Sequence, residues 1–252
     1  MVKVTGYQKR FYRDSNRHRG LEYFTVTVKE TDLLIAAQRP LIVEAREAVL
    51  KYRNQLENYI EKYPGFKESL IPVPYEQFAP AIVKDMMQAA EKAGVGPMAS
   101  VAGAIAECVG RDLLHLSKEI IIENGGDLFL SILHDTLVEI YAGNSFLSGR
   151  LALKIKAKNT PLGVCTSSGT VGHSKSFGTS DAVTIVSNSA ALADAAATAV
   201  GNVVHTKQDI GKGLEQAQAI DGVRGVLIIK DHKLGVWGDI ELKKISGQTK
   251  PA

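Results

Sequence analysis

Cysteine and long apolar runs are scarce in this sequence, and each scarcity excludes a class of protein. Only two cysteines occur among 252 residues, Cys108 and Cys165, and they lie far apart. This spacing argues against a disulfide framework and against a zinc site built on cysteine pairs. No apolar run approaches the ~20 residues of a membrane-spanning helix, and the first residues lack the apolar core of a secretory signal. We therefore expect no membrane association and a cytoplasmic location.

An excess of one charge is also missing. The chain has 30 Lys and Arg against 27 Asp and Glu, a formal net charge of +3, which is too small to imply a nucleic-acid partner. The first twenty residues are nevertheless rich in basic side chains: Lys3, Lys9, Arg10, Arg13, Arg17 and Arg19. They form either a solvated leading segment, which we favour, or an arm that binds phosphate or another anion.

What remains is the composition of an ordinary globular protein. Hydrophobic residues make up 45% of the chain and charged residues 23%. A chain of 252 residues can bury a substantial core. We expect a single domain over residues 1–252, with residues 1–20 as a loose basic arm.

Local patterns predict both helices and strands. Apolar residues at helical spacing predict helices over residues 41–63, 80–93, 99–116, 189–200 and 210–219. Alternating apolar residues predict strands over residues 21–28, 33–37, 119–123, 128–133, 137–142, 151–157, 163–167, 182–186, 225–230 and 235–243. The strands come in hairpin runs, with Asn124-Gly125 as the plainest turn signal. The order therefore favours an α+β fold with antiparallel sheets and packed helices.

One apparent nucleotide-binding motif is rejected. Residues 94–99 read Gly-Val-Gly-Pro-Met-Ala, which has the letters of a dinucleotide fingerprint. A helix rather than a strand is predicted before it, and Pro97 lacks the N–H that a phosphate cradle needs. We interpret the segment as a tight turn between two helices.

A nearly uncharged helix is the most informative element. Residues 190–200 are mostly alanine and carry one acid, Asp194, with Thr198 four positions later on the same face. Such a helix is usually buried, and a buried carboxylate needs a donor or a cation. Carboxylate and hydroxyl oxygens suit Mg²⁺. The alternative is a capping or hydrogen-bonded pair; we favour the metal site.

Two polar loops carry further candidates for a ligand site. Residues 123–127 place an amide and two acids around a glycine pair, which allows a ligand to approach the backbone. A second loop after residue 165 offers hydroxyl and N–H donors, and His173 adds a titratable imidazole. Either loop can also be a simple turn. The candidate binding residues are Gly125, Gly126, Asp127, Thr166, Ser167, Ser168 and Gly169.

Cys165, next to the second loop, has two interpretations. It is a small core residue, which we favour, or a thiolate nucleophile or sulfur carrier activated by His173. The second interpretation belongs to an alternative function, that of a non-catalytic accessory protein in metabolite or sulfur handling.

Taken in order, several of these segments resemble the ApbE-like superfamily, whose best-known members are Mg²⁺-dependent FAD:protein FMN transferases. The matching segments are residues 104–106, 121–127, 166–169 and 193–199. Residues 28–33, 95–103 and 165–174 are more closely similar to an ApbE-related family of archaea and bacteria. This closer resemblance covers nearly the whole chain. The resemblance implies an ApbE-like α+β architecture.

The resemblance also implies roles for single residues. Asp194 and Thr198 fall where the transferases hold Mg²⁺, residues 125–127 fall on their Gly-Gly-Asp motif, and residues 166–169 on their Thr-Ser-Gly loop. Two positions depart from the pattern. Glu107-Cys108 replaces a lysine-glycine pair, and only His173 remains of a His-x-x-Asp-Pro element.

These observations lead to one leading expectation. The protein binds a phosphorylated small molecule or a nucleotide, such as the flavin FAD, together with Mg²⁺, and is a candidate transferase or hydrolase. In that role Asp194 and Thr198 hold the metal, and Asp194 and His173 are the candidate catalytic residues.

Overall fold

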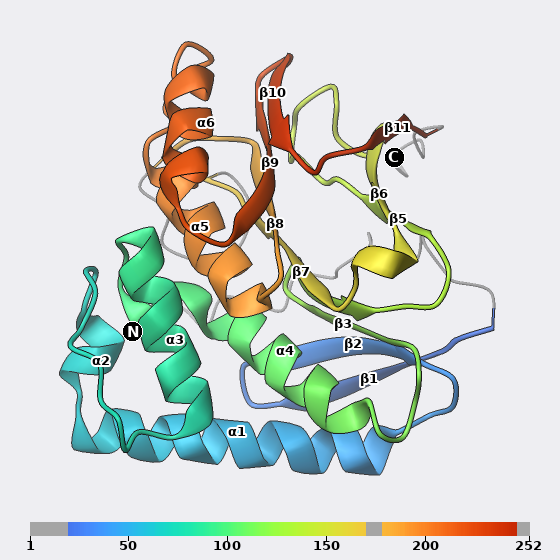
Figure 1. Cartoon of the computed structure of the whole chain (residues 1–252), viewed down its shortest axis with the longest axis vertical. Helices are drawn as coiled ribbons and strands as arrows, with labels where there is room; N and C mark the ends of the chain where they lie inside the picture. The colour runs from blue at the N-terminus through green and yellow to red at the C-terminus, as the bar shows by residue number, and fades with distance from the viewer. Residues whose placement is uncertain (1–19, 170–177, 246–252) are drawn as a thin grey trace, which may run out of the picture.

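The computed structural model describes residues 20–169 and 178–245. The predicted basic arm and His173 lie outside these residues, except for Gly20. Figure 1 shows the arrangement, with helices gathered over one face of a long sheet and a smaller sheet over part of its other face.

The long sheet has eight antiparallel strands in the order β1-β2-β3-β4-β7-β8-β9-β10. Their bounds are β1 Glu22–Val28, β2 Thr31–Ala37, β3 Ile120–Asn124, β4 Asp127–Ser131, β7 Leu162–Ser167, β8 Ala182–Ser187, β9 Val223–Lys230 and β10 Lys233–Gly238. Short turns join β1 to β2, β3 to β4 and β9 to β10, whereas the helices lie in the longer connections from β2 to β3 and from β8 to β9. The predicted α+β class with antiparallel sheets is confirmed.

The second sheet has three strands in the order β11-β6-β5. They are β5 Thr136–Glu139, β6 Leu151–Ile155 and β11 Leu242–Lys244. Residues 137–142 and 151–157, predicted as strands of unspecified partners, thus belong to a separate sheet. The single strand predicted over residues 235–243 is wrong, because these residues contain parts of two strands, β10 and β11. Gly238, with φ +77°, ends β10 and allows the chain to cross to the smaller sheet.

Six α-helices and two 3-10 turns are present among the described residues: α1 Ile42–Lys62, α2 Gly65–Glu68, α3 Ala81–Ala93, η2 Pro97–Ser100, α4 Val101–Leu113, η3 Ala157–Asn159, α5 Ala190–Asn202 and α6 Ile210–Ala219. The helix predicted over 99–116 corresponds to α4, and η2 comes directly before it. Pro97 can begin η2 because the backbone N–H that it lacks is not needed in a first turn. α2 was not predicted.

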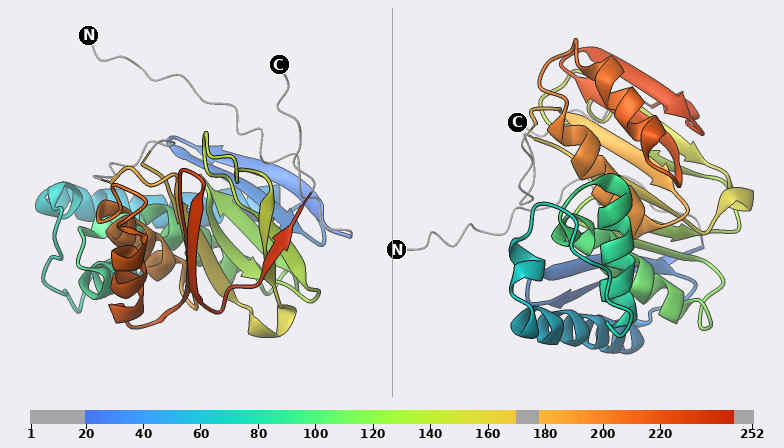
Figure 2. Two further views of the ribbon diagram at one scale, coloured as in Figure 1. Left: turned by 90° about the horizontal axis from the view of Figure 1, so that it is seen from above. Right: turned by 60° about the vertical axis from the view of Figure 1, so that its left-hand side comes forward.

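The long sheet separates two apolar cores. Every second residue along these strands packs against the helices, for example Ile122, Phe129 and Ile185. The residues between them, such as Leu130 and Leu227, point to the other face and pack against the smaller sheet. This is the two-residue period of a strand buried on both faces. Figure 2 shows the helices on one side of the sheet.

Within the described residues, no single helix is long and apolar enough to cross a membrane. Taken together, residues 81–93 and 97–113 are long and apolar enough, but the two segments meet at a bend of 104°.

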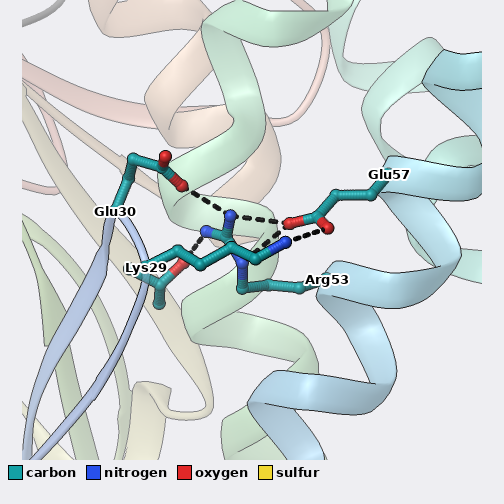
Figure 3. Close-up of polar contacts among 5 residues, drawn as sticks. Lys29, Glu30, Arg53 and Glu57 are labelled. Carbon is teal, nitrogen blue, oxygen red and sulfur yellow. Dashed lines mark hydrogen bonds and ion pairs between the residues drawn. The ribbon is translucent and has the colours of Figure 1, made fainter.

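A charged network joins the turn between β1 and β2 to α1 (Figure 3). The Arg53 guanidinium donates to Thr31 Oγ1 at 2.7 Å, to Glu30 Oε2 at 2.6 Å and to Glu57 Oε1 at 2.7 Å. Lys29 Nζ donates to Glu57 Oε2 at 2.6 Å. The pKa of Glu57 is lowered, first by the Lys29 hydrogen bond. The planar fork of Arg53 thus fixes α1 against the hairpin.

This network yields a testable difference between two cations. Arg53→Lys is expected to lower the free energy of unfolding by about 1 kcal/mol, because a lysine cannot reproduce the fork. Lys29→Met is the matched control, and its exposed ion pair is expected to contribute less than about 0.5 kcal/mol. Urea unfolding measures both values. Equal effects of the two substitutions would contradict the role given to Arg53.

Candidate functional site

Helices α4 and α5 cap each other's N-termini. The Asp194 carboxylate of α5 accepts a hydrogen bond from the Gly103 N–H of α4 at 2.9 Å. In return, Glu107 Oε2 of α4 accepts from the Ala190 N–H of α5 at 2.6 Å and from Ser189 Oγ at 3.0 Å. N–H groups in a first helical turn have no partner within the helix. Each carboxylate therefore supplies what the other helix lacks.

Glu107 also explains one departure from the transferase pattern. Arg111 holds its Oε1 with two donors, Nε at 3.0 Å and Nη2 at 2.7 Å. The carboxylate thus lies at the positive end of α5, where a helix favours an anion. The N-terminus of α5 is therefore occupied by a side chain of the protein itself.

Two glycines allow the backbones to meet at this point. A Cβ on Gly103 would lie 2.2 Å from the Ala190 carbonyl oxygen and 2.9 Å from Asp194 Cβ. A Cβ on Gly163 of β7 would lie 2.3 Å from Ala190 Cα. The start of α5 is therefore held against both α4 and β7, and this close contact sets the position of Asp194.

Only one line of α5 is open to solvent. Every residue of α5 is buried except Asp194, Thr198 and Asn202, which are half-buried. They are spaced four residues apart and therefore lie on one face, each a turn from the next. The sequence analysis identified Asp194 and Thr198 but missed Asn202, which the same spacing would have included.

Asp127, the first residue of β4, faces Asp194 across the helix-sheet boundary. Burial raises the pKa of Asp194 to about 7, while the N–H groups of Gly103 and Ala102 lower it. Burial and then the charge of Asp194 raise the pKa of Asp127 well above its ordinary value. In such surroundings one of two neighbouring carboxyls keeps its proton, unless a cation lies between them and allows both to ionise.

The glycine pair forms the turn before Asp127. Gly125 and Gly126 have φ of +71° and +106°, and Asn124 pairs with Asp127 across the turn. Left-handed φ values suit glycine and produce a tight hairpin. The Gly126 N–H donates to Glu123 Oε1 at 2.8 Å. The turn signal was read correctly, and the turn brings Asp127 to the site.

The hydroxyl loop, residues 166–169, begins with the last two residues of β7, the strand next to β4. Thr166, Ser167 and Ser168 are half-buried, and Gly169 is exposed. Thr166 Oγ1 lies 2.9 Å from Thr184 Oγ1, so this hydroxyl has a partner on β8. The Thr166 backbone N–H is one of the groups that lower the pKa of Asp127. The loop therefore borders the carboxylate pair, and only its beginning is described.

The environment of Cys165 favours its interpretation as a core residue. The side chain is fully buried, and its Sγ donates to the Ala190 carbonyl at 3.3 Å. Burial, followed by the charges of Asp127 and Asp194, raises its pKa well above the ordinary value. Reactive cysteines are accessible and have lowered pKa values. The sulfur-handling alternative therefore has no support from this thiol.

The donor set fits a magnesium ion better than zinc. Among residues 20–169 and 178–245, no group of three or more His, Cys, Asp and Glu side chains is arranged to hold a metal. Mg²⁺ needs less, because it accepts one or two carboxylates and keeps waters or ligand oxygens. The carboxylates of Asp194 and Asp127 and the Thr198 hydroxyl are oxygen donors of the required kind.

The sequence analysis named Glu107 and Asn124 but did not predict what their side chains contact. The small residues of α4 gave no sign that Glu107 is important. No neighbouring residue indicates that its carboxylate caps a helix that begins 83 positions later in the chain. Asn124 was read as part of a turn, but its Nδ2 donates to the Ala102 carbonyl at 3.0 Å. It therefore joins the β3–β4 turn to the start of α4.

Comparison with solved structures reveals the same fold in flavin transferases. The flavinyl transferase ApbE from Pseudomonas stutzeri matches with a TM-score of 0.52 and 14% identity over 86% of this chain and 94% of that chain. The ApbE protein from Thermotoga maritima matches with a TM-score of 0.54 and 12% identity over 86% and 96%. At these identities the likeness concerns the fold alone.

Sequence comparison gives much stronger similarity. The UPF0280 protein of Methanocaldococcus jannaschii is 44% identical over 221 residues, which is 85% of this chain and 90% of the relative. The UPF0280 protein of Methanosarcina acetivorans is 38% identical over 216 residues, 84% and 85% of the two chains. The family model described as "AbpE bacteria" matches residues 14–231. The chain therefore belongs to this family, that of the UPF0280 proteins, and has the fold of the ApbE flavin transferases.

Proposed function

We propose that this protein binds a phosphorylated small molecule or nucleotide together with Mg²⁺ at the face formed by α5 and the β3–β4 turn. One observation carries the proposal. Asp127 and Asp194 are adjacent carboxyls with raised pKa values. Burial raises both pKa values, and neighbouring carboxylates raise that of Asp127. Hydrogen bonds from N–H groups, and from a thiol to Asp127, lower them. A divalent cation is the natural counter-charge for such a pair.

We assign the residues of this face two roles, binding of the cation and binding of the ligand. Asp194, Thr198 and Asp127 would supply oxygen ligands to the cation. Thr166, Ser167 and Ser168 would donate hydrogen bonds to a phosphate or carboxylate of the ligand. When bound, Mg²⁺ would neutralise phosphate charge. In the metal-free protein Asp194 has a pKa of about 7, so it would release its proton when the cation binds.

A flavin nucleotide is the first ligand to test, because the solved structures of this fold include proteins named flavin transferases. Transfer or hydrolysis of the flavin nucleotide would follow only if binding is found. The N-terminus of α5 is capped by Glu107. We therefore expect ligand phosphate to be held through the cation and the hydroxyl loop instead.

The test is a titration of FAD followed by flavin fluorescence, with and without Mg²⁺. We expect quenching that requires Mg²⁺. Asp194→Asn keeps an acceptor for the Gly103 N–H but removes the charge, and Thr198→Val removes only the hydroxyl. Each is expected to weaken Mg²⁺-dependent binding at least about tenfold, which corresponds to about 1.4 kcal/mol.

Thr206→Val is the matched control, since its hydroxyl donates to Asp209 Oδ2 before α6, outside the segments assigned to the proposed site. It should leave binding unchanged. FAD binding that is indifferent to Mg²⁺ and to both site variants would refute the metal assignment. Absence of FAD binding, with Mg²⁺ binding retained in calorimetry, would keep the metal site and exclude the flavin.

A further inference from the structure

One peptide group of α4 contacts both the β3–β4 turn and α5. It is the peptide between Ala102 and Gly103, in the first turn of the helix. Its N–H donates to Asp194 Oδ2 at 2.9 Å, and its C=O accepts from Asn124 Nδ2 at 3.0 Å. Because a carbonyl oxygen can only accept, this contact fixes the orientation of the Asn124 amide. The start of α4 is therefore a common reference point for Asn124 and Asp194.

Asn124 lies next to the second carboxylate of the site. It is the last residue of β3 and lies opposite Asp127, the first residue of β4, in the register of the two strands. Only 6% of Asn124 is exposed. The two residues between them are Gly125 and Gly126, which have no side chains to restrain the turn. The Asn124 amide therefore ties the end of the hairpin that carries Asp127 to α4.

Asp194 is held at the same point of α4 from the other side. N–H groups in a first helical turn have no partner within the helix and are free to bind a carboxylate. Burial raises the pKa of Asp194, while hydrogen bonds from the N–H groups of Gly103 and Ala102 lower it. The position of Asp127 relative to Asp194 thus depends on a chain of contacts through the start of α4, and Asn124 is the side chain that completes it.

We propose that Asn124 is a positioning residue that sets the spacing of the Asp127 and Asp194 carboxylates and thereby selects Mg²⁺ against larger divalent cations such as Ca²⁺. This inference rests on the proposed cation site and adds the group that determines its selectivity. Mg²⁺ requires a nearly ideal octahedron with oxygen ligands at ~2.0–2.1 Å, whereas Ca²⁺ accepts irregular arrangements at ~2.3–2.6 Å. Loosening the spacing of the two carboxylates therefore weakens binding of the smaller ion more.

The test compares binding of Mg²⁺ alone and of Ca²⁺ alone to the full chain by calorimetry. Asn124→Leu keeps a branched side chain of similar size and removes the donor. It is expected to raise the dissociation constant for Mg²⁺ at least about tenfold, as is usual when a group that orients a metal ligand is lost. The constant for Ca²⁺ should change less than about threefold, because Ca²⁺ tolerates altered ligand geometry.

Ser117→Ala is the matched control. Ser117 is 2% exposed, and its Oγ donates to the Glu119 carbonyl at 2.6 Å, just before the opposite end of β3. Its loss should lower stability without changing the dissociation constant for either ion. Urea unfolding of each variant separates a loss of stability from a change in selectivity. Asn124→Ala takes the place of Asn124→Leu if the latter does not fold, since it removes the donor without adding bulk.

Loss of Mg²⁺ affinity with little change for Ca²⁺ supports the role of Asn124. Equal weakening of both ions, or no weakening of either, would overturn that role and leave the cation site intact. A wild-type protein that binds neither ion would overturn the cation site itself, and the positioning role with it. If the wild type binds Mg²⁺ but no Ca²⁺, the loss of Mg²⁺ affinity in the Asn124 variant relative to Ser117→Ala decides.

Discussion

Gly103→Ala is expected to lower the free energy of unfolding by about 3 kcal/mol or more, despite the better helix propensity of alanine. The added Cβ would lie 2.2 Å from the Ala190 carbonyl oxygen and 2.9 Å from Asp194 Cβ. A backbone oxygen cannot move without moving α5. The two helices must therefore separate, and the hydrogen bond from Gly103 to Asp194 is weakened with them.

Gly211→Ala in α6 is the matched control, because a Cβ there meets nothing within 4 Å. It should stabilise the protein by up to about 1 kcal/mol through helix propensity alone. Chemical denaturation measures both variants. If Gly103→Ala proved as harmless as Gly211→Ala, the close contact between α4 and α5 would be disproved. Ligand binding by Gly103→Ala should fall as well, since Asp194 is displaced.

The metal-free protein is expected to lose stability as the pH rises from about 4 to about 7, through Asp194. Its pKa of 3.8 in the unfolded chain is raised to about 7 in the folded protein. In this window the folded state binds more protons than the unfolded state, so stability falls with increasing pH. The effect is on the order of a few kcal/mol. Asp127 acts in the same direction, since its pKa is also raised.

The measurement compares wild type with Asp194→Asn between pH 5 and 8 in the presence of a chelator. The variant should show a flatter profile and exceed the wild type in stability near pH 8. Groups with lowered pKa values, such as Glu57 and Asp209, affect both proteins equally. Their contribution is lost only as the pH falls further. Parallel profiles of the two proteins would show that Asp194 is not protonated in the fold.

Magnesium gives the same experiment a second outcome. At pH 8, Mg²⁺ is expected to raise the melting temperature of the wild type and to have little effect on Asp194→Asn. A ligand that binds only the folded state stabilises it by mass action. An equal effect on both proteins would locate the cation elsewhere.

Much of the candidate site was predictable because its signals are local. A helix that is nearly all alanine with one acid and one hydroxyl at a spacing of four marks Asp194 and Thr198. A glycine pair between two apolar runs marks the turn before Asp127. Both patterns lie within a few residues of chain, and their physical causes, helix period and backbone freedom, act over the same distance.

Other features depend on contacts that no local pattern records. That Asp127 faces Asp194, and that both pKa values rise, follows from the packing of α5 on β4 and β7. The role of Glu107 depends on α4 lying beside the start of α5. Desolvation and like-charge repulsion act through space rather than along the chain. The sequence therefore indicated the candidate residues, and the tertiary structure decided their charge state.

The partners of the strands were decided in the same way. The sequence by itself indicated most of the segments that form strands, because alternation of apolar side chains is a property of each segment. It did not determine that β5, β6 and β11 form a separate sheet, or that β10 is an edge. Both outcomes depend on which apolar faces the two cores can cover, and that choice exists only once the whole chain has packed.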